Sequence, residues 1–175
     1  METVKWFERV FTFGLPNGML PFYIERLEGT LPRIEKKIKD IPEDILSHRL
    51  DNKWSVKENI GHLAEVDQIA NKRIDEIISG ISPMSPAVFE PKPYHEWPIR
   101  KMLQYFHENR KKNIERYQSL TAGELQKTSL HPRLKLMMSP VDLAWFDAEH
   151  DDHHLVRIND ILSTLLRKSA NTNIQ

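Results

Sequence analysis

Apolar residues recur at intervals of three and four along four long stretches of this chain, and this spacing is the period of an amphipathic α-helix. The predicted helices span residues 18–38, 55–78, 98–120 and 139–167, and no segment has a convincing β-strand pattern. Pro32 lies within the first stretch, so the sequence predicts a kink or break there. Long amphipathic helices with sizeable loops favour an all-α, up-and-down four-helix bundle.

Polar residues and prolines mark where the helices begin and how they are joined. Ser55 and Glu58 have the spacing of a capping box, and Ser139 with Pro140 is typical of an N-cap and first helical position. The predicted loops are residues 40–54, 79–97 and 121–138, and the second carries four prolines. Loops of that length often have a functional role. The chain of 175 residues suits one domain, 1–175, with its core at about 18–167.

The N-terminal segment mixes charged and aromatic residues, which predicts a short amphipathic helix that packs on the bundle rather than on a membrane surface. Its charged residues interrupt any apolar core of a signal peptide. The charged residues are Glu2, Lys5, Glu8 and Arg9, and the aromatic ones are Trp6, Phe7, Phe11 and Phe13.

Charge and composition exclude several classes of function. Lys plus Arg and Asp plus Glu both number 25, so no net field draws the protein to nucleic acid or to an anionic membrane. No apolar run approaches the roughly 20 residues that span a bilayer, and we expect a cytoplasmic protein. Cysteine is absent, which removes disulfides, thiolate ligands and a cysteine nucleophile, so thiol chemistry would need an external thiol. Phosphate-loop, Rossmann, nucleophile-elbow, paired Glu-x-x-His and His-Glu-x-x-His motifs are also missing from the sequence.

His150 and His154 are the strongest candidates for chemistry, because residues four apart on a helix leave the same face. They belong to an inward stripe that is apolar at both ends and polar in the middle. Its members are Leu143, Asp147, His150, His154, Ile158, Ile161 and Leu165. Buried polar groups need partners, so we interpret the pair as metal ligands. The alternative is a polar surface strip beside Asp151, Asp152 and His153.

His62 is the predicted third ligand. In an up-and-down bundle the second and fourth helices run parallel, with His62 seven residues into one and His150 eleven into the other. At ~1.5 Å per residue these depths differ by about one turn, which places the site toward the end where both helices begin. Three neutral imidazoles plus water form a recurrent open metal site.

Two loops, 40–54 and 121–138, would lie at that end of the bundle and supply walls. Their candidate wall or mouth residues are Trp54, His131, Arg133, Met137 and Met138.

Further residues are assigned roles around this site. Glu65, three residues after His62, is a candidate carboxylate ligand or base, although an ordinary salt bridge is the interpretation we prefer. Asp147, one turn before His150, is a candidate to orient an imidazole. His131 is a second candidate for proton transfer and Arg133 for substrate binding, although most such loop residues only cap or pack. His153 points about 100° away from His154 and is interpreted as a solvated histidine or as one that supports a ligand from behind.

Two groups of residues resemble a known family. The segment Trp54–Glu58 leading to Gly61–Leu63, with Glu149–Leu155 near the end, resembles the DinB-like superfamily, which includes the YfiT-type metal-dependent hydrolases and bacillithiol transferases. The resemblance covers about residues 18–167.

The resemblance implies a four-helix bundle that holds one divalent metal ion, often nickel or zinc, on three histidines. By motif position these are His62, His150 and His154. It also implies a homodimer, a small-molecule substrate and, in some members, a low-molecular-weight thiol cosubstrate. Many relatives have Gln three residues after the last histidine, where this chain has Arg157. Arg157 is therefore a candidate residue of the pocket or of the groups that support the ligands, and the resemblance does not carry over the substrate specificity of any particular relative.

The leading hypothesis is a metal-dependent enzyme that activates a thiol or water for transfer or hydrolysis on a small molecule. A second hypothesis is a non-catalytic, metal-binding or stress-associated bundle. A third is a metal-free helical interaction protein, for which changing the three histidines would alter neither stability nor metal content.

Overall fold

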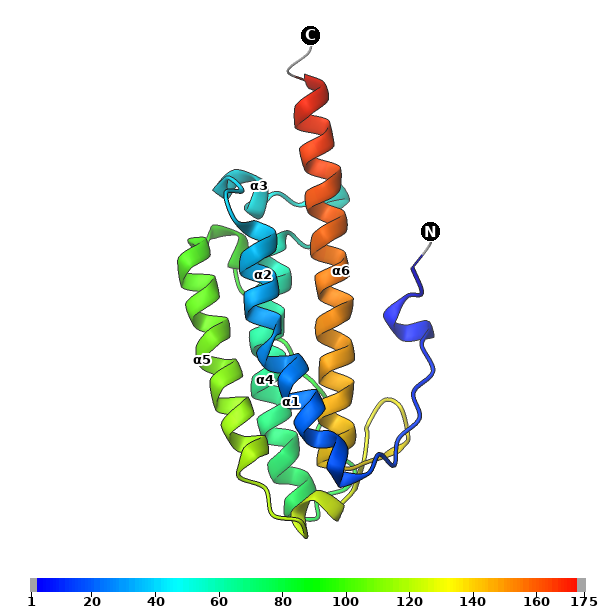
Figure 1. The fold of residues 1–175 in the computed structure, drawn as a ribbon. Helices are drawn as coiled ribbons and strands as arrows, with labels where there is room; N and C mark the ends of the chain where they lie inside the picture. The colour runs from blue at the N-terminus through cyan, green and yellow to red at the C-terminus, as the bar shows by residue number, and fades with distance from the viewer. Residues whose placement is uncertain (1–2, 173–175) are drawn as a thin grey trace.

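The computed structural model describes residues 3–172, and it is a bundle of long helices (Figure 1). The four-helix bundle is confirmed, with one of its four rods split into α1 and α2. The α-helices are α1 (Leu20–Glu28), α2 (Thr30–Ile38), α3 (Glu43–Ser47), α4 (Val56–Ile78), α5 (Ile99–Gln118) and α6 (Pro140–Thr172). Short 3₁₀ turns are η1 (Trp6–Glu8), η2 (Asn17–Met19), η3 (Leu50–Asn52), η4 (Tyr94–Glu96) and η5 (Glu124–Gln126).

Two small elements lie within segments that the sequence predicts as loops. The five-residue helix α3 interrupts the first loop. In the third, β1 (Ser129–Leu130) pairs antiparallel with β2 (Met137–Met138), in the register Ser129 opposite Met138. These elements are too short to produce a readable hydrophobic period.

The helix directions differ from the up-and-down arrangement that we predicted. Arg110 pairs with Asp67 and Arg116 with Asp75, so α4 and α5 run parallel. Asn59 contacts His154 on α6, and ring contacts join His62 to His150, so α4 and α6 run antiparallel.

Loop length explains how two consecutive helices can be parallel. The helix α4 has 23 residues and is about 35 Å long. The connection of residues 79–98, at roughly 3.3 Å per extended residue, is long enough to return along it.

The break in the first rod falls at Gly29, three residues before Pro32. Pro32 lies in the first turn of α2, where a proline's missing N–H group removes a helical hydrogen bond that would reach back into α1. The two halves stay nearly continuous because the N–H of Gly29 bonds to the carbonyl of Glu25 and the N–H of Arg33 bonds to that of Gly29. The predicted break near Pro32 is therefore present.

The two helices that carry the site begin where the sequence predicts, because each has a reciprocal cap. The N–H of Glu58 donates to Ser55 Oγ at 3.2 Å, and the N–H of Ser55 donates to Glu58 Oε2 at 2.8 Å. Ser139 and Asp142 repeat this pattern at the start of α6, at 2.9 and 3.2 Å. These local hydrogen bonds set where the helices begin.

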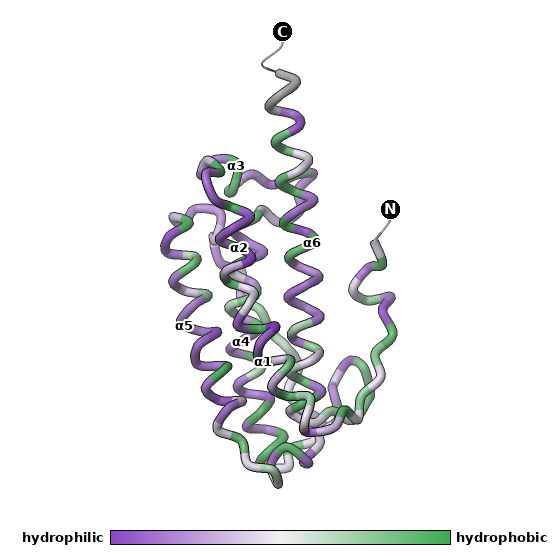
Figure 2. The backbone as a smooth tube through the Cα atoms, in the orientation of Figure 1, coloured by the Kyte–Doolittle hydropathy of each residue, from purple (hydrophilic) through white to green (hydrophobic). Residues whose placement is uncertain are grey.

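Figure 2 shows apolar and polar residues alternating along the helices, and the apolar faces meet in two buried clusters. One cluster joins the later part of α2 to the start of α4 and the later part of α6. The other joins α1 to the ends of α4 and α5 and the start of α6. Between the clusters lies a buried polar belt centred on Arg110, which donates to Asp67, to Asp151 and to the carbonyl of Leu27.

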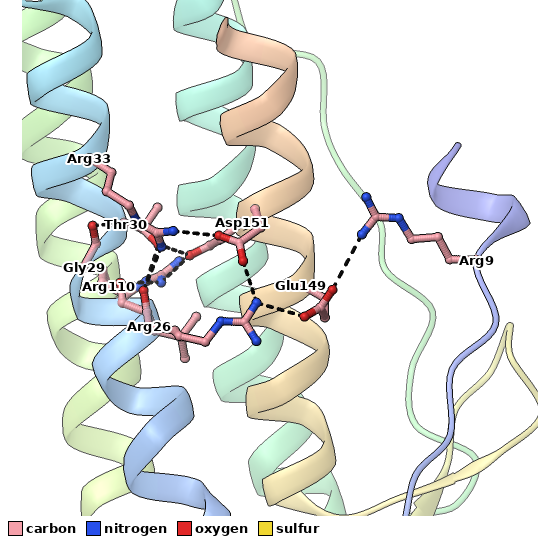
Figure 3. A network of polar contacts seen from close by, with 10 residues as sticks. Arg9, Arg26, Gly29, Thr30, Arg33, Arg110, Glu149 and Asp151 are labelled. Atoms are coloured by element: carbon pink, nitrogen blue, oxygen red, sulfur yellow. Dashed lines mark hydrogen bonds and ion pairs between the residues drawn. The ribbon is translucent and has the colours of Figure 1, made fainter. Parts of the chain in front are cut away.

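Thr30 and the arginines of the first rod extend this belt toward the surface of α6 (Figure 3). The Thr30 hydroxyl donates to Asp151 Oδ2 at 2.6 Å. Arg26 donates to Glu149 at 2.9 Å, and Glu149 also lies 3.7 Å from Arg9 of the N-terminal segment. These ion pairs fix the orientation of the α6 residues on either side of His150.

The N-terminal segment does pack on the bundle, but the predicted amphipathic helix is wrong. Only the single turn η1 forms, and the chain from Arg9 to Pro16 carries no helix. The rings of Phe11 and Phe13 stack with an interplanar angle of 4°. Side chains two apart share a face in extended chain but not in a helix, so this packing favours the extended form. Glu2 lies outside the described residues.

Within residues 3–172, no helix combines the length and the apolar character required to cross a membrane.

Candidate metal centre

Three histidines meet between α4 and α6. His62 comes from α4, and His150 and His154 from successive turns of α6. One ring nitrogen from each lies within 4.8 Å of the others, and the Nε2 atoms of His150 and His154 are 3.2 Å apart. Because the two helices are antiparallel, the site lies along the length of the bundle and not at an end where both helices begin.

The donor atoms fit a divalent ion with imidazole ligands. Two nitrogens at 2.0–2.1 Å from a tetrahedral zinc would be separated by about 3.3 Å. The Nε2 atoms of His150 and His154 already have a separation close to this value. Imidazole is a good ligand for zinc and nickel, so the chemistry of the donor set also fits.

Burial keeps these imidazoles neutral, as metal ligands must be. Burial lowers the pKa of His62 to about 4, with a smaller contribution from the charge of His153. Burial also lowers the pKa of His150 and of His154 well below the usual range, and the neighbouring imidazoles lower both further. At neutral pH all three rings therefore carry lone pairs that a cation can use.

Asn59 orients one of these rings, and the sequence analysis missed it. Its Oδ1 atom lies 2.7 Å from His154 Nδ1, and its Nδ2 group donates to the carbonyl of Ser55 at 2.8 Å. Because the amide nitrogen is used by Ser55, Oδ1 is free to accept from Nδ1–H, which leaves His154 Nε2 as the donor atom toward the metal. Asn59 precedes His62 by three residues on the same helix face, and that spacing was the available signal.

Aromatic rings surround the donor set. Trp54 lies 4.8 Å from the His62 ring and stacks on the His154 ring at 6.1 Å. Phe89, from the connection after α4, lies 4.6 Å from His62. Trp6, from the N-terminal segment, meets the edge of His150 at 4.9 Å. Trp54 was a candidate wall residue from the sequence, whereas Phe89 and Trp6 were missed because only long-range packing brings them here.

Glu65 lies one turn beyond His62 and forms an ion pair with Lys92 at 2.8 Å, as the preferred salt-bridge interpretation predicts. The two residues line a polar surface hollow of about 290 Å³ together with Gln68 and Glu90.

Asp147 has a different partner from the imidazole that we predicted. It is buried, and its Oδ2 atom accepts from the Tyr117 hydroxyl at 3.1 Å. Burial, assisted by nearby Asp67, raises the pKa of Asp147 to about 8.

The loop that carries His131 is at the opposite end of the bundle from the loop that carries Trp54, because α4 and α6 are antiparallel (Figure 1). His131 Nδ1 accepts from the N–H groups of Arg133 and Leu134 at 3.3 and 3.0 Å, so this ring organises its own loop. The Arg133 guanidinium packs on the Phe7 ring at 3.5 Å.

The remaining candidates have lesser roles around the site. Met138 is buried in an apolar cluster and Met137 is exposed, so only the former contributes to packing. His153 is partly buried, and its ring lies 5.7 Å from Trp6. Arg157, half-buried one turn further along α6, helps to lower the pKa of His153 and of His154 through its charge.

Fold and donor set together define a class of protein: a four-helix bundle with parallel second and third rods and a three-histidine cluster on two antiparallel helices. The chain belongs to the DinB superfamily, whose family model matches residues 26–158.

A solved structure has the same fold. It is YfiT from Bacillus subtilis, described as a probable metal-dependent hydrolase with an unusual four-helix bundle topology. The TM-score is 0.77 at 15% sequence identity, over 90% of this chain and 93% of that one. Comparison with curated proteins gave no match.

Proposed function

We propose that this protein is a metal-dependent enzyme that holds one divalent ion, nickel or zinc, on His62, His150 and His154, and activates a thiol or water for transfer or hydrolysis on a small molecule. The observation that carries the proposal is the meeting of three buried or half-buried, neutral imidazoles within 4.8 Å. Membership of the DinB superfamily and the fold shared with YfiT, a probable metal-dependent hydrolase, support it.

When bound, such an ion lowers the pKa of a water or thiol and stabilises developing negative charge. The residues of this chain prepare the site for that chemistry. Asn59 holds the tautomer of His154, and the Trp54 ring packs beside the rings of His62 and His154.

Glu65 is one of two candidates to accept a proton, since it lies one turn from His62, but it would first have to leave its ion pair with Lys92 in the polar hollow. His131 is less suited, since its Nδ1 atom already accepts two backbone N–H groups. The small-molecule substrate, the thiol cosubstrate and the homodimer remain predictions from the family resemblance.

The test is elemental analysis of protein purified without a histidine tag. We expect about one zinc or nickel ion per chain in the wild-type protein and in His153→Ala, and none in His150→Ala. His153→Ala is the matched control, because His153 lies on the same helix but outside the donor cluster. Circular dichroism checks that each variant keeps its helices.

Two results would count against the proposal. If wild-type protein binds neither zinc nor nickel after both are supplied, the three histidines do not form a metal centre. Protein that binds cobalt, but whose visible spectrum is unchanged by added thiol, azide or pH, would have a closed coordination sphere and a structural ion instead of a catalytic one.

A further inference from the structure

Three aromatic side chains from three separate segments converge on the histidine cluster. Trp54 precedes α4, Phe89 belongs to the connection after α4, and Trp6 forms part of η1. Trp54 and Phe89 are 46% and 41% exposed, although each contacts a buried histidine. Single exposed apolar residues are common, but exposed rings gathered around one polar site are typical of a ligand-binding surface.

Each ring belongs to a segment that is anchored outside the cluster. Trp54 directly precedes Ser55, whose capping box fixes the backbone there. Trp6 packs on Phe146 at 5.1 Å and lies under the Arg9 guanidinium.

The segment of Phe89 is anchored by an ion pair shortly after the ring. Val88 and Glu90 line the polar hollow, whereas Phe89 contacts His62, so successive side chains alternate in direction. Lys92, three residues later, is tied to Glu65. The segments that carry the rings are therefore positioned before any ligand arrives, which lowers the entropic cost of binding.

The chemistry of the three aromatic side chains indicates which kind of ligand group they would bind. The rings offer flat apolar faces next to the metal donors, and the described charged groups of the hollow lie on the other side of the Phe89 segment. Offset or edge-to-face contact with an aromatic group is favoured by such faces.

We propose that Trp54 and Phe89, with Trp6 beside His150, bind an aromatic or similarly flat apolar group of the substrate, next to the atom that coordinates the metal. This inference rests on the proposed function and narrows its substrate class to small molecules with an aryl or flat apolar group beside the reacting centre.

The test compares two metal-chelating probes that share the hydroxamate group. Acetohydroxamic acid carries a methyl group, and benzohydroxamic acid carries a phenyl ring in its place. Calorimetric titration of the metal-loaded protein should give at least ~10-fold tighter binding of the phenyl probe. Trp54→Leu and Phe89→Leu keep apolar bulk but remove the ring, and each should reduce that preference to about threefold or less. Phe22→Leu is the matched control, because Phe22 is 64% exposed on α1.

Metal content is measured on every sample first, so the two proposals fail differently. Wild-type protein without metal would overturn the proposed function. Wild-type protein with metal but equal affinity for both probes, or an unchanged preference in both ring variants, would overturn the aromatic surface alone. A ring variant that loses its metal would show that this ring supports the histidines and does not bind the ligand.

Discussion

Asn59 Oδ1 and His154 Nδ1 lie 2.7 Å apart and join α4 to α6 immediately behind the histidine cluster. The hydrogen bond connects one turn of α4 to the last histidine of the cluster. It determines which nitrogen of His154 faces the other two rings.

We expect Asn59→Ala to weaken metal affinity by about 10- to 100-fold, because the freed imidazole loses its fixed tautomer and orientation. Asn59→Asp keeps an acceptor for Nδ1–H and should retain most of the affinity. Competition with a chromophoric chelator measures both dissociation constants.

The matched control for this prediction is Asn109→Ala, which removes a buried asparagine that bonds to Gln68 instead of a histidine. Equal metal affinity in Asn59→Ala and wild-type protein would show that packing alone orients His154.

Gly61 allows the connection after α4 to approach the helix beside the site. A Cβ atom built at Gly61 would lie 2.5–2.7 Å from three atoms of the Tyr94 ring, which is buried. Gly61→Ala should therefore lower the free energy of unfolding by about 1–2 kcal/mol, even though alanine is the better helix former. Urea denaturation measures the change.

Gly18→Ala is the control for that substitution, because no other atom lies within 4 Å of its added Cβ. A Gly61→Ala protein as stable as wild type would mean that Tyr94 moves aside without cost.

Arg110 compensates two buried carboxylates from different helices, Asp67 and Asp151. Arg110→Ala should cost about 3–5 kcal/mol at pH 7, because it leaves both carboxyls buried without their cation. Arg116→Ala removes the exposed pair with Asp75, also between α5 and α4, and should cost less than about 1 kcal/mol.

The pH dependence provides a second check of the Arg110 prediction. Burial already raises the pKa of Asp67 to about 7, and loss of the guanidinium would raise it further in the folded state, so the stability of the variant falls as pH rises. The loss in Arg110→Ala should therefore be smaller at pH 5 than at pH 7. A loss that is equal at both pH values would assign the effect of Arg110 to packing.

Asp147 makes the protein less stable as the solution becomes more alkaline. Burial raises its pKa from 3.8 to about 8, so the folded state keeps a proton that the unfolded state releases. Its contribution to stability is present in acid and is lost as pH rises from about 4 to 8.

Asp147→Asn should therefore raise the free energy of unfolding, with a gain that grows from pH 5 to pH 8 and reaches about 2 kcal/mol. Asp75→Asn, at an exposed carboxylate, is the control. Metal content should not change, because Asp147 contacts Tyr117. Loss of metal in Asp147→Asn would show that Asp147 does orient an imidazole, as the sequence predicts.

Local interactions account for the parts of the fold that could be predicted. The caps at Ser55 and Ser139 depend on residues three apart, so the starts of α4 and α6 are readable from sequence. Helix direction is not readable in this way, because periodicity identifies a buried face and carries no information about which way the chain runs along it. The long connection of residues 79–98 permitted either direction.

Among the residues of the candidate site, too, those that belong to a local pattern were predicted and those brought in by long-range packing were not. The spacing of His150 and His154 is a property of one helix, and His62 was added by motif and by an assumed topology. The assumed helix direction is wrong, yet the three rings do meet, because the motif did not depend on direction. Phe89 and Trp6 were missed because no local pattern links them to a histidine.

The three histidines lie on helices anchored by capping boxes and by the Arg110 belt, whereas the aromatic rings around them lie on segments outside the long helices. Substitutions at Phe89 or Trp6 should thus change what can approach the histidine cluster without moving the imidazoles. Such a scaffold can acquire new substrates by exchanging surface segments while its coordination chemistry stays constant, which makes those segments the natural place to engineer selectivity.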